Sequence, residues 1–197
     1  MQSYGAHSDQ IGQSNRPGRP IIIVPGSDSY QGNLNLKNCL SFLRDGKYRD
    51  ASTIQQTQEE KLEKCKYFEK KICGEKVQFE VHDSVLSFTN KEWRRVVCLF
   101  SCGEEFQLKD FPPKESDEDF HGAPTDMQKK IVNLFHRVKG FYFHYQDIPE
   151  PPKVKTWNVT RVIIERNKRY HDINVSNQFW KEMEVFLKKE KFKGARF

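Results

Sequence analysis

A short apolar run near the N-terminus constrains the fold more than any other feature of the sequence. Four consecutive β-branched residues, Ile21 to Val24, stand between two prolines, and Gly26 follows. A strand without polar positions is buried on both faces, which is typical of parallel or mixed sheets that helices cover. A second run of this kind spans residues 96–100. The sequence therefore predicts two central strands within a layered α/β domain.

Helical and strand-like patterns alternate along the rest of the chain. Apolar residues at helical spacing predict helices over 36–43, 52–72, 127–138 and 176–189. Alternation of polar and apolar residues predicts strands over 77–81, 85–87, 141–145 and 157–164, and residues 105–108 are expected to extend or pair with the strand at 95–100. This order predicts a three-layer α/β fold, with a mixed sheet and helices on both faces.

Local signals suggest where two of these helices begin and end. Thr57 and Glu60 have the spacing of a capping box, and Gly74 is expected to end the 52–72 helix. Thr125 is expected to cap the 127–138 helix, which Gly140 would end.

The domain organisation follows from composition. Residues 1–18 are rich in Gly, Ser, Gln and Asn, which predicts a solvated tail or linker. Residues 19–197 have the length of one domain, which we expect to be monomeric. No stretch of about 20 apolar residues occurs, so neither a signal peptide nor a membrane partner is expected.

Charge and cysteine usage restrict the partners and the compartment. Residues 153–197 contain 12 Lys and Arg against 5 Asp and Glu, whereas 104–120 contain 7 acidic and 2 basic residues. This distribution suits an anionic or mixed-charge partner, although a lopsided solvated surface would look the same. None of the five cysteines forms a C-x-x-C pair, and Cys98 and Cys102 lie on an apolar run. A reducing compartment is therefore expected, cytosol or nucleus.

The loop after the first strand stands where a phosphate-binding loop would lie. That loop requires G-x-x-x-x-G-K-[ST], with a lysine for charge and a hydroxyl for magnesium. Here Gly26 and Gly32 are one residue too far apart, and Asn33 and Leu34 occupy the lysine and hydroxyl positions. The sequence predicts a degenerate nucleotide site, and we expect 26–34 to be a structural connector.

Other catalytic and cofactor signatures are also absent from the sequence. Segments 90–93 and 167–170 resemble the guanine-reading motif N-K-x-D, but both lack its aspartate. The histidines show no H-E-x-x-H pairing, and no G-x-S-x-G nucleophile elbow occurs. We therefore predict no catalytic residue, no cofactor and no metal site, and a binding module instead of an enzyme.

Basic and aromatic residues supply the candidate contacts with a partner. Guanidinium groups suit phosphate oxygens, and an aromatic ring flanked by cations can stack on a partner. An ordinary solvated strand end and a turn anchored by a tryptophan are the structural alternatives. Trp157 and Trp180, in contrast, are expected in the core. The candidate partner-binding residues are Arg161, Arg166, Lys168, Arg169, His171, Trp93 and Arg94.

Several segments together resemble the C-terminal domain of the parafibromin family. The segments that carry the resemblance are Arg19-Pro20-Ile21-Ile22-Ile23-Val24-Pro25, Arg95-Val96-Val97 after Trp93, Trp157-Asn158-Val159-Thr160, and Phe179-Trp180 before Ala195-Arg196-Phe197. They occur in matching order over about 19–197. The charged 52–71 segment and the acidic 114–120 loop depart from the family pattern.

The resemblance implies a Ras-like fold, similar to P-loop GTPases, without nucleotide binding. It also implies a nuclear role in transcription elongation by RNA polymerase II. The expected partners are subunits of the polymerase-associated factor complex, chromatin, and phosphorylated tails of the elongation machinery. Two alternatives stay open: a divergent GTPase or ATPase, and a purely structural domain that contacts other subunits.

Overall fold

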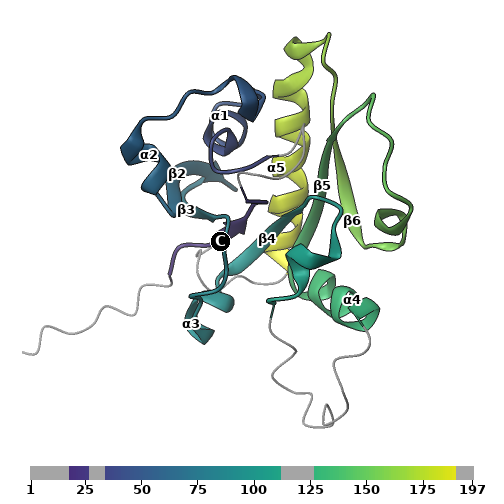
Figure 1. The fold of residues 1–197 in the computed structure, drawn as a ribbon. Helices are drawn as coiled ribbons and strands as arrows, with labels where there is room; N and C mark the ends of the chain where they lie inside the picture. The colour runs from purple at the N-terminus through teal and green to yellow at the C-terminus, as the bar shows by residue number, and fades with distance from the viewer. Residues whose placement is uncertain (1–17, 27–33, 112–126, 190–197) are drawn as a thin grey trace, which may run out of the picture.

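The computed structural model describes residues 18–26, 34–111 and 127–189, which form a six-stranded sheet flanked by helices (Figure 1). Across the sheet the strand order is β2-β3-β1-β4-β5-β6. The strands span Ile21–Ile23 (β1), Cys65–Ile72 (β2), Glu75–His82 (β3), Val96–Ser101 (β4), Lys139–Tyr145 (β5) and Val159–Ile164 (β6). Only β2 runs antiparallel to its neighbour. The predicted mixed sheet of a Ras-like domain is confirmed.

Five α-helices and four short 3-10 helices connect the described strands. The α-helices are Cys39–Leu43 (α1), Gln58–Leu62 (α2), Asn90–Trp93 (α3), Met127–Arg137 (α4) and Asp172–Lys189 (α5). The 3-10 helices are Ala51–Thr53 (η1), Glu105–Leu108 (η2), Pro152–Thr156 (η3) and Arg169–His171 (η4). Four segments lie outside the described residues: 1–17 of the predicted tail, 27–33 of the connector, 112–126 with the acidic 114–120 loop and Thr125, and 190–197.

Two hydrophobic clusters, one on each face of the sheet, form the core. In β1, Ile22 packs into one cluster, whereas Ile21 and Ile23 pack into the other. The helices α1 and α5 contribute to the first cluster, and α4 contributes to the second. This arrangement explains why β1 has no polar position, and it confirms the predicted three layers.

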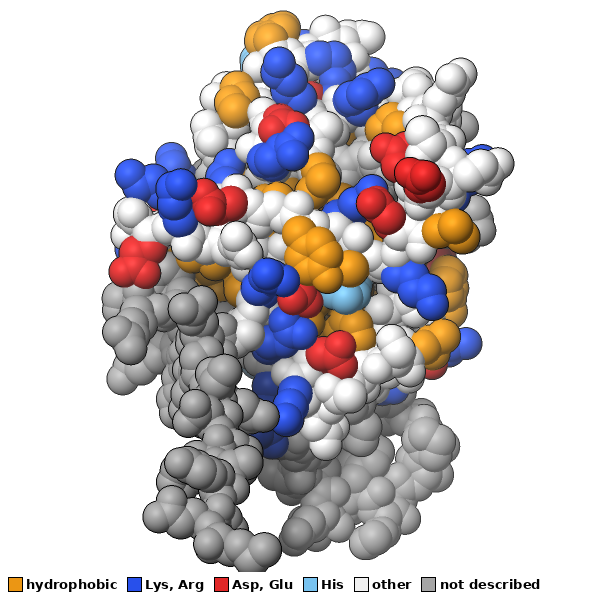
Figure 2. Space-filling view, turned by 90° about the vertical axis from the view of Figure 1, so that its left-hand side faces the viewer, with side chains coloured by type: hydrophobic (Ala, Val, Ile, Leu, Met, Phe, Trp, Pro, Cys, Tyr) orange, Lys and Arg blue, Asp and Glu red, His pale blue; other side chains and the backbone are white. Residues whose placement is uncertain are grey.

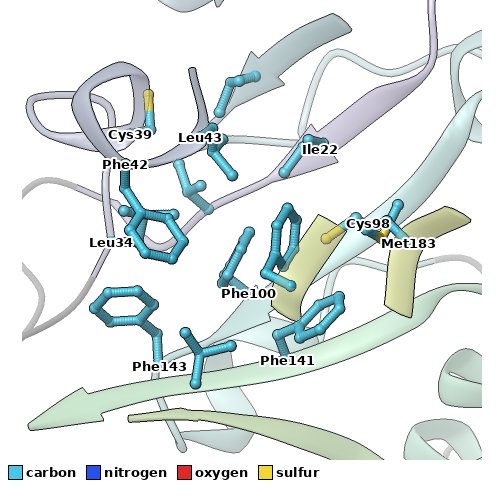
Figure 3. Close-up of a cluster of buried hydrophobic side chains, with 14 of the residues drawn as sticks. Ile22, Leu34, Cys39, Phe42, Leu43, Cys98, Phe100, Phe141, Phe143 and Met183 are labelled. Carbon is cyan, nitrogen blue, oxygen red and sulfur yellow. The ribbon is translucent and has the colours of Figure 1, made fainter. Parts of the chain in front are cut away.

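Aromatic rings fill the cluster on the α5 face. Figure 3 shows Phe143 close to Phe42 of α1, with Phe100 and Phe141 further along the same face of the sheet. The ring centroids of Phe42 and Phe143 are 5.0 Å apart, and those of Phe141 and Phe179 are 4.7 Å apart. Trp157 and Trp180 are buried, at 4% and 5% exposure, as predicted.

The predicted helix over 52–72 is confirmed only at 58–62, since 52–53 belong to a 3-10 helix, 54–57 are not helical and the chain beyond 64 forms a strand. Its capping box is confirmed, because Glu60 N–H donates to the Thr57 hydroxyl at 3.2 Å and Thr57 N–H donates to the Glu60 carboxylate at 2.8 Å. The chain then forms β2, which pairs with β3 through a turn in which Cys73 and Gly74 have φ values of 52° and 90°. Two positive φ angles match the type I′ hairpin turn.

The physical reason for this error is a lysine on the buried side of β2. Phe68 and Ile72 are buried, and Lys70 lies between them on the same face of the strand. The Lys70 ammonium lies 5.4 Å from the centroid of the Trp180 ring. A charged residue at this position hides the alternation of a strand, and the four-residue spacing from Phe68 to Ile72 also fits a helix.

Four smaller predictions are also corrected. Residues 85–87 form no strand, and Glu105–Leu108 form a 3-10 helix. The helix α5 begins at Asp172, four residues before the predicted start at 176. Gly140 lies within β5 and does not end α4. A Cβ atom at Gly140 would lie 2.4 Å from the ring of Phe135, so a glycine lets α4 pack closely on β5.

Candidate binding surface

Five of the seven predicted contact residues lie on β6 and the loop that follows it. Arg161 is part of β6, and the other four lie at 166–171, between β6 and α5. Because β4, β5 and β6 are parallel, their carboxyl ends share this edge of the sheet. Ligands of open α/β sheets commonly bind at this edge.

A hollow of about 430 Å³ lies beside this loop. We call its lining the β6–α5 loop patch, and its residues are Gln146, Asp147, Glu165, Arg166, Asn167 and Lys168. The exposed Tyr170 follows in the same loop, with 71% of its surface accessible. The patch therefore combines cations, carboxylates and an aromatic side chain.

The cations of the patch each have an acidic partner. Arg166 Nε donates to the Asp147 carboxylate at 2.9 Å, and the guanidinium lies 3.6 Å from the centroid of the Tyr145 ring. Lys168 Nζ lies 2.8 Å from the Glu165 carboxylate. Hydrogen bonds with Lys168, which has the larger effect, and with His171 lower the pKa of Glu165.

Arg161, Arg169 and His171 take part in contacts inside the domain. Arg161 forms an ion pair with Glu150 at 2.8 Å and donates to the backbone carbonyls of Val159 and Val154. His171 Nδ1 lies 3.0 Å from the Glu165 carboxylate. Arg169 donates to the Tyr48 carbonyl and pairs with Asp172. Arg161 and Arg169 thus connect neighbouring segments of the fold.

Trp93 and Arg94 lie at the other end of the parallel strands. They belong to the end of α3, directly before β4, whereas the patch follows the carboxyl end of β6. Figure 1 shows α3 at the foot of the view and the start of α5 at the top. The Trp93 ring is half-buried between Phe88 and Phe111, at centroid distances of 5.2 and 5.0 Å. The seven predicted residues therefore do not form one surface.

Aromatic residues fill the carboxyl edge of the sheet above β5. The Tyr48 ring centroid lies 5.0 Å from that of Phe143 and 5.7 Å from that of Tyr145. The Tyr145 hydroxyl donates to the Asp50 carboxylate at 2.8 Å, and burial is the largest effect that raises the pKa of Tyr48 and of Tyr145. This edge of the sheet is therefore occupied by packed side chains.

Three of the five described cysteines are buried thiols. Burial raises the pKa of the Cys39 thiol to about 12 and also raises the pKa of Cys98 and Cys102. Thiols that stay protonated are poor nucleophiles. No three His, Cys, Asp or Glu side chains within 18–26, 34–111 and 127–189 are grouped to hold a metal ion. No helix of this described portion combines the length and apolar composition of a membrane crossing.

Two structural features were not predicted from the sequence. The contact network of Tyr48, Arg169 and Asp172 joins residues more than 120 positions apart. A groove between β2 and α5 brings the lysines at 70 and 71 beside Lys181. The only available signal for the groove was the pair of adjacent lysines, which the predicted helix placed on a solvated face. Both features depend on distances between residues far apart in the sequence, and the tertiary fold sets those distances.

Comparisons with known proteins agree with this architecture. "Cell division control protein 73" of Saccharomyces cerevisiae is 29% identical over 187 residues, which cover 94% of this chain and 43% of that protein. "Protein CDC73 homolog" of Arabidopsis thaliana is 28% identical over 177 residues, or 87% of this chain and 39% of that protein. The chain thus spans less than half the length of these relatives.

A solved structure and a family model show which part of these relatives the chain corresponds to. The structure titled "The conserved domain of yeast Cdc73" superimposes with a TM-score of 0.68 at 28% identity, covering 86% of this chain and 97% of that one. Residues 16–186 match the family described as "RNA pol II accessory factor, Cdc73 family, C-terminal". The resemblance to the parafibromin family is confirmed, and the chain belongs to the Cdc73 family of RNA polymerase II accessory factors.

Proposed function

We propose that this chain contains a non-catalytic protein-binding domain, residues 19–197, that acts in transcription elongation in the nucleus. It helps to attach the polymerase-associated factor complex to chromatin and to phosphorylated tails of the RNA polymerase II elongation machinery. Family membership supports the transcriptional role. The observation that carries the binding role is the β6–α5 loop patch, where Arg166 and Lys168 line one hollow at the carboxyl edge of the sheet.

The acidic partners in this patch do not prevent it from binding an anion. Both Arg166 and Asp147 are substantially exposed, and exposed ion pairs typically contribute only about 0–1 kcal/mol. A phosphate dianion carries more charge than a carboxylate and accepts two parallel hydrogen bonds from a guanidinium. Phosphate can therefore replace Asp147 on Arg166 at little energetic cost. Trp93 and Arg94 would serve a separate contact of the same domain.

Charge reversal in the patch tests this proposal. The double variant Arg166→Glu and Lys168→Glu is expected to weaken binding to nucleosomes and to synthetic phosphorylated polymerase-tail peptides by about tenfold or more, since one charge-assisted hydrogen bond contributes about 1.5–3 kcal/mol. Fluorescence anisotropy at fixed salt measures the affinity. The control Lys61→Glu and Lys91→Glu makes the same charge change at exposed positions of α2 and α3. Equal affinity of both double variants and the wild type would remove the patch as a binding site.

A nucleotide titration separates this proposal from a divergent GTPase or ATPase. We expect no saturable binding of fluorescent guanine or adenine nucleotides with magnesium up to about 100 μM, a concentration that detects a free energy near −6 kcal/mol. The reasons are the missing lysine and hydroxyl at Asn33 and Leu34 and the packed Tyr48 and Tyr145 rings. Saturation at micromolar nucleotide would contradict the non-catalytic assignment. Pull-downs with chromatin and with isolated complex subunits distinguish the purely structural alternative.

A further inference from the structure

A groove between β2 and α5 contains an unusual excess of positive charge. Its volume is about 600 Å³. The strand β2 contributes Lys70 and Lys71, and α5 contributes Asn177, Lys181 and Glu184. We call this the β2–α5 groove. Its lining thus includes three lysines and one glutamate.

The three lysines of the groove differ from the cations of the β6–α5 loop patch. Within residues 18–26, 34–111 and 127–189, none of the three forms an ion pair with a carboxylate. The carboxylate of Glu184 accepts a hydrogen bond from the Cys73 N–H at 3.4 Å, at the β2–β3 turn. In the patch, by contrast, Arg166 and Lys168 each contact an acidic side chain. The groove therefore holds the less compensated positive charge of the two sites.

Lys70 is the most constrained of these cations. Its ammonium faces the ring of Trp180, and its partial burial lowers the pKa of Lys70, while the charge of Asp45 opposes the shift. The carboxylate of Asp45 is bound by Arg44, whose Nε donates to it at 2.7 Å. An anion in the groove would gain from a cation that is already positioned and partly desolvated.

We propose that the β2–α5 groove binds a phosphorylated side chain of an extended peptide. The lysine ammonium groups supply the charge, and the amide of Asn177 supplies a neutral hydrogen-bond donor. The ligand class of this inference rests on the proposed function, and the β2–α5 groove is proposed as a second phosphate-binding surface beside the β6–α5 loop patch.

The structure favours a peptide over a single-stranded nucleic acid. Nucleic acid would require exposed aromatic rings on which bases stack. Trp180 is only 5% exposed, Lys70 covers its ring, and its indole N–H donates to the Leu43 carbonyl at 2.9 Å. On the flank of the molecule shown in Figure 2, Lys and Arg alternate with Asp and Glu instead of forming a continuous basic track.

Binding of a model phosphopeptide tests the groove in the whole 197-residue chain. The probe is a fluorescein-labelled ten-residue Gly-Ser peptide with one phosphoserine, and its unphosphorylated form is compared with it. Lys71→Glu with Lys181→Glu changes two exposed side chains and is expected to weaken phosphopeptide binding by about tenfold. Lys70→Met keeps the apolar stem over Trp180 but removes the charge, and it should weaken binding less. Lys188→Glu with Lys189→Glu, further along α5, is the matched control.

An NMR titration gives a readout that does not depend on a mutation. The phosphopeptide is expected to shift the ¹H–¹⁵N signals of the Trp180 indole and of the Asn177 and Lys181 amides, whereas the unphosphorylated peptide should not. Unchanged signals there, together with unchanged affinity of the Lys71/Lys181 variant, would overturn the inference. Tighter binding of a 20-nucleotide single-stranded DNA, lost in the same variant, would overturn the ligand class.

The two double variants show separately whether the patch proposal or the groove proposal is wrong. If the Arg166/Lys168 variant alone loses phosphopeptide affinity, the proposed function stands and the groove inference is wrong. If the Lys71/Lys181 variant alone loses it, the groove inference stands and the patch is not the phosphate site. If neither variant loses affinity, both assignments are wrong.

Discussion

Replacing Phe179 with alanine is expected to lower the free energy of unfolding by about 4 kcal/mol, within the range for truncating a buried phenylalanine. The Phe179 side chain is 1% exposed, and its ring centroid lies 4.7 Å from that of Phe141 and 5.2 Å from that of Phe100. The ring joins α5 to β4 and β5, so its removal opens a cavity that neighbouring rings cannot close without leaving their own contacts.

Urea unfolding followed by circular dichroism measures this effect. The midpoint should fall with little change in the slope, because the surface exposed on unfolding stays nearly the same. Val185→Ala is the matched control on the same helix, since Val185 is 68% exposed and should lose no more than about 0.5 kcal/mol. A loss below about 1.5 kcal/mol for Phe179→Ala would contradict the packing described for this face.

Replacing Asp172 with alanine is expected to cost about 3 kcal/mol, because breaking a buried pair leaves its partners without compensation. Asp172 is 4% exposed, accepts a hydrogen bond from the Tyr48 N–H at 3.0 Å and pairs with Arg169. The substitution removes the acceptor of the Tyr48 N–H and leaves Arg169 with its hydrogen bond to the Tyr48 carbonyl. It also removes an acidic residue from the first turn of α5, where the helix dipole favours negative charge.

Asp172→Asn separates the hydrogen bond from the charge. The amide oxygen can still accept from Tyr48 N–H, so we expect this variant to lose only about 1 kcal/mol. Thermal unfolding of both variants at one pH measures the difference. Equal losses for alanine and asparagine would show that the hydrogen bond to Tyr48 contributes nothing to stability.

The same pair has a defined pH dependence. Burial raises the pKa of Asp172, and the hydrogen bond from Tyr48 and the charge of Arg169 oppose this shift without cancelling it. The folded state therefore holds the proton more tightly than the unfolded state. Relative to Asp172→Asn, the wild type should lose stability as the pH rises from the ordinary aspartate range, about pH 4, through the raised pKa.

The sequence predicted well those elements whose pattern has a single physical explanation. A run such as Ile21–Val24 fits only a strand buried on both faces, and α4 has a clear apolar stripe. Errors arose where one side chain serves two roles. Lys70 is charged yet lies on the buried face of β2, and Gly140 resembles a helix stop yet serves close packing in β5.

The candidate binding residues were predictable as a charge cluster but not as a site. Composition alone found the basic segment that contains Arg166 and Lys168. Some of its cations form ion pairs within the domain, as Arg161 does with Glu150, and the sequence does not show which ones. The groove lysines at 70 and 71 became candidates only beside Lys181, more than 100 residues later in the chain.

The sequence by itself determined the layered α/β class, the buried central strands and the loss of the phosphate-binding motif, because these depend on residue type and local spacing. The tertiary structure alone decided that β2 is a strand, that the cations of the β6–α5 loop patch are paired, and that the lysines of the β2–α5 groove form no ion pair with the described carboxylates. The physical reason is that ion pairing and burial depend on distances between segments far apart in the chain, and only packing sets those distances.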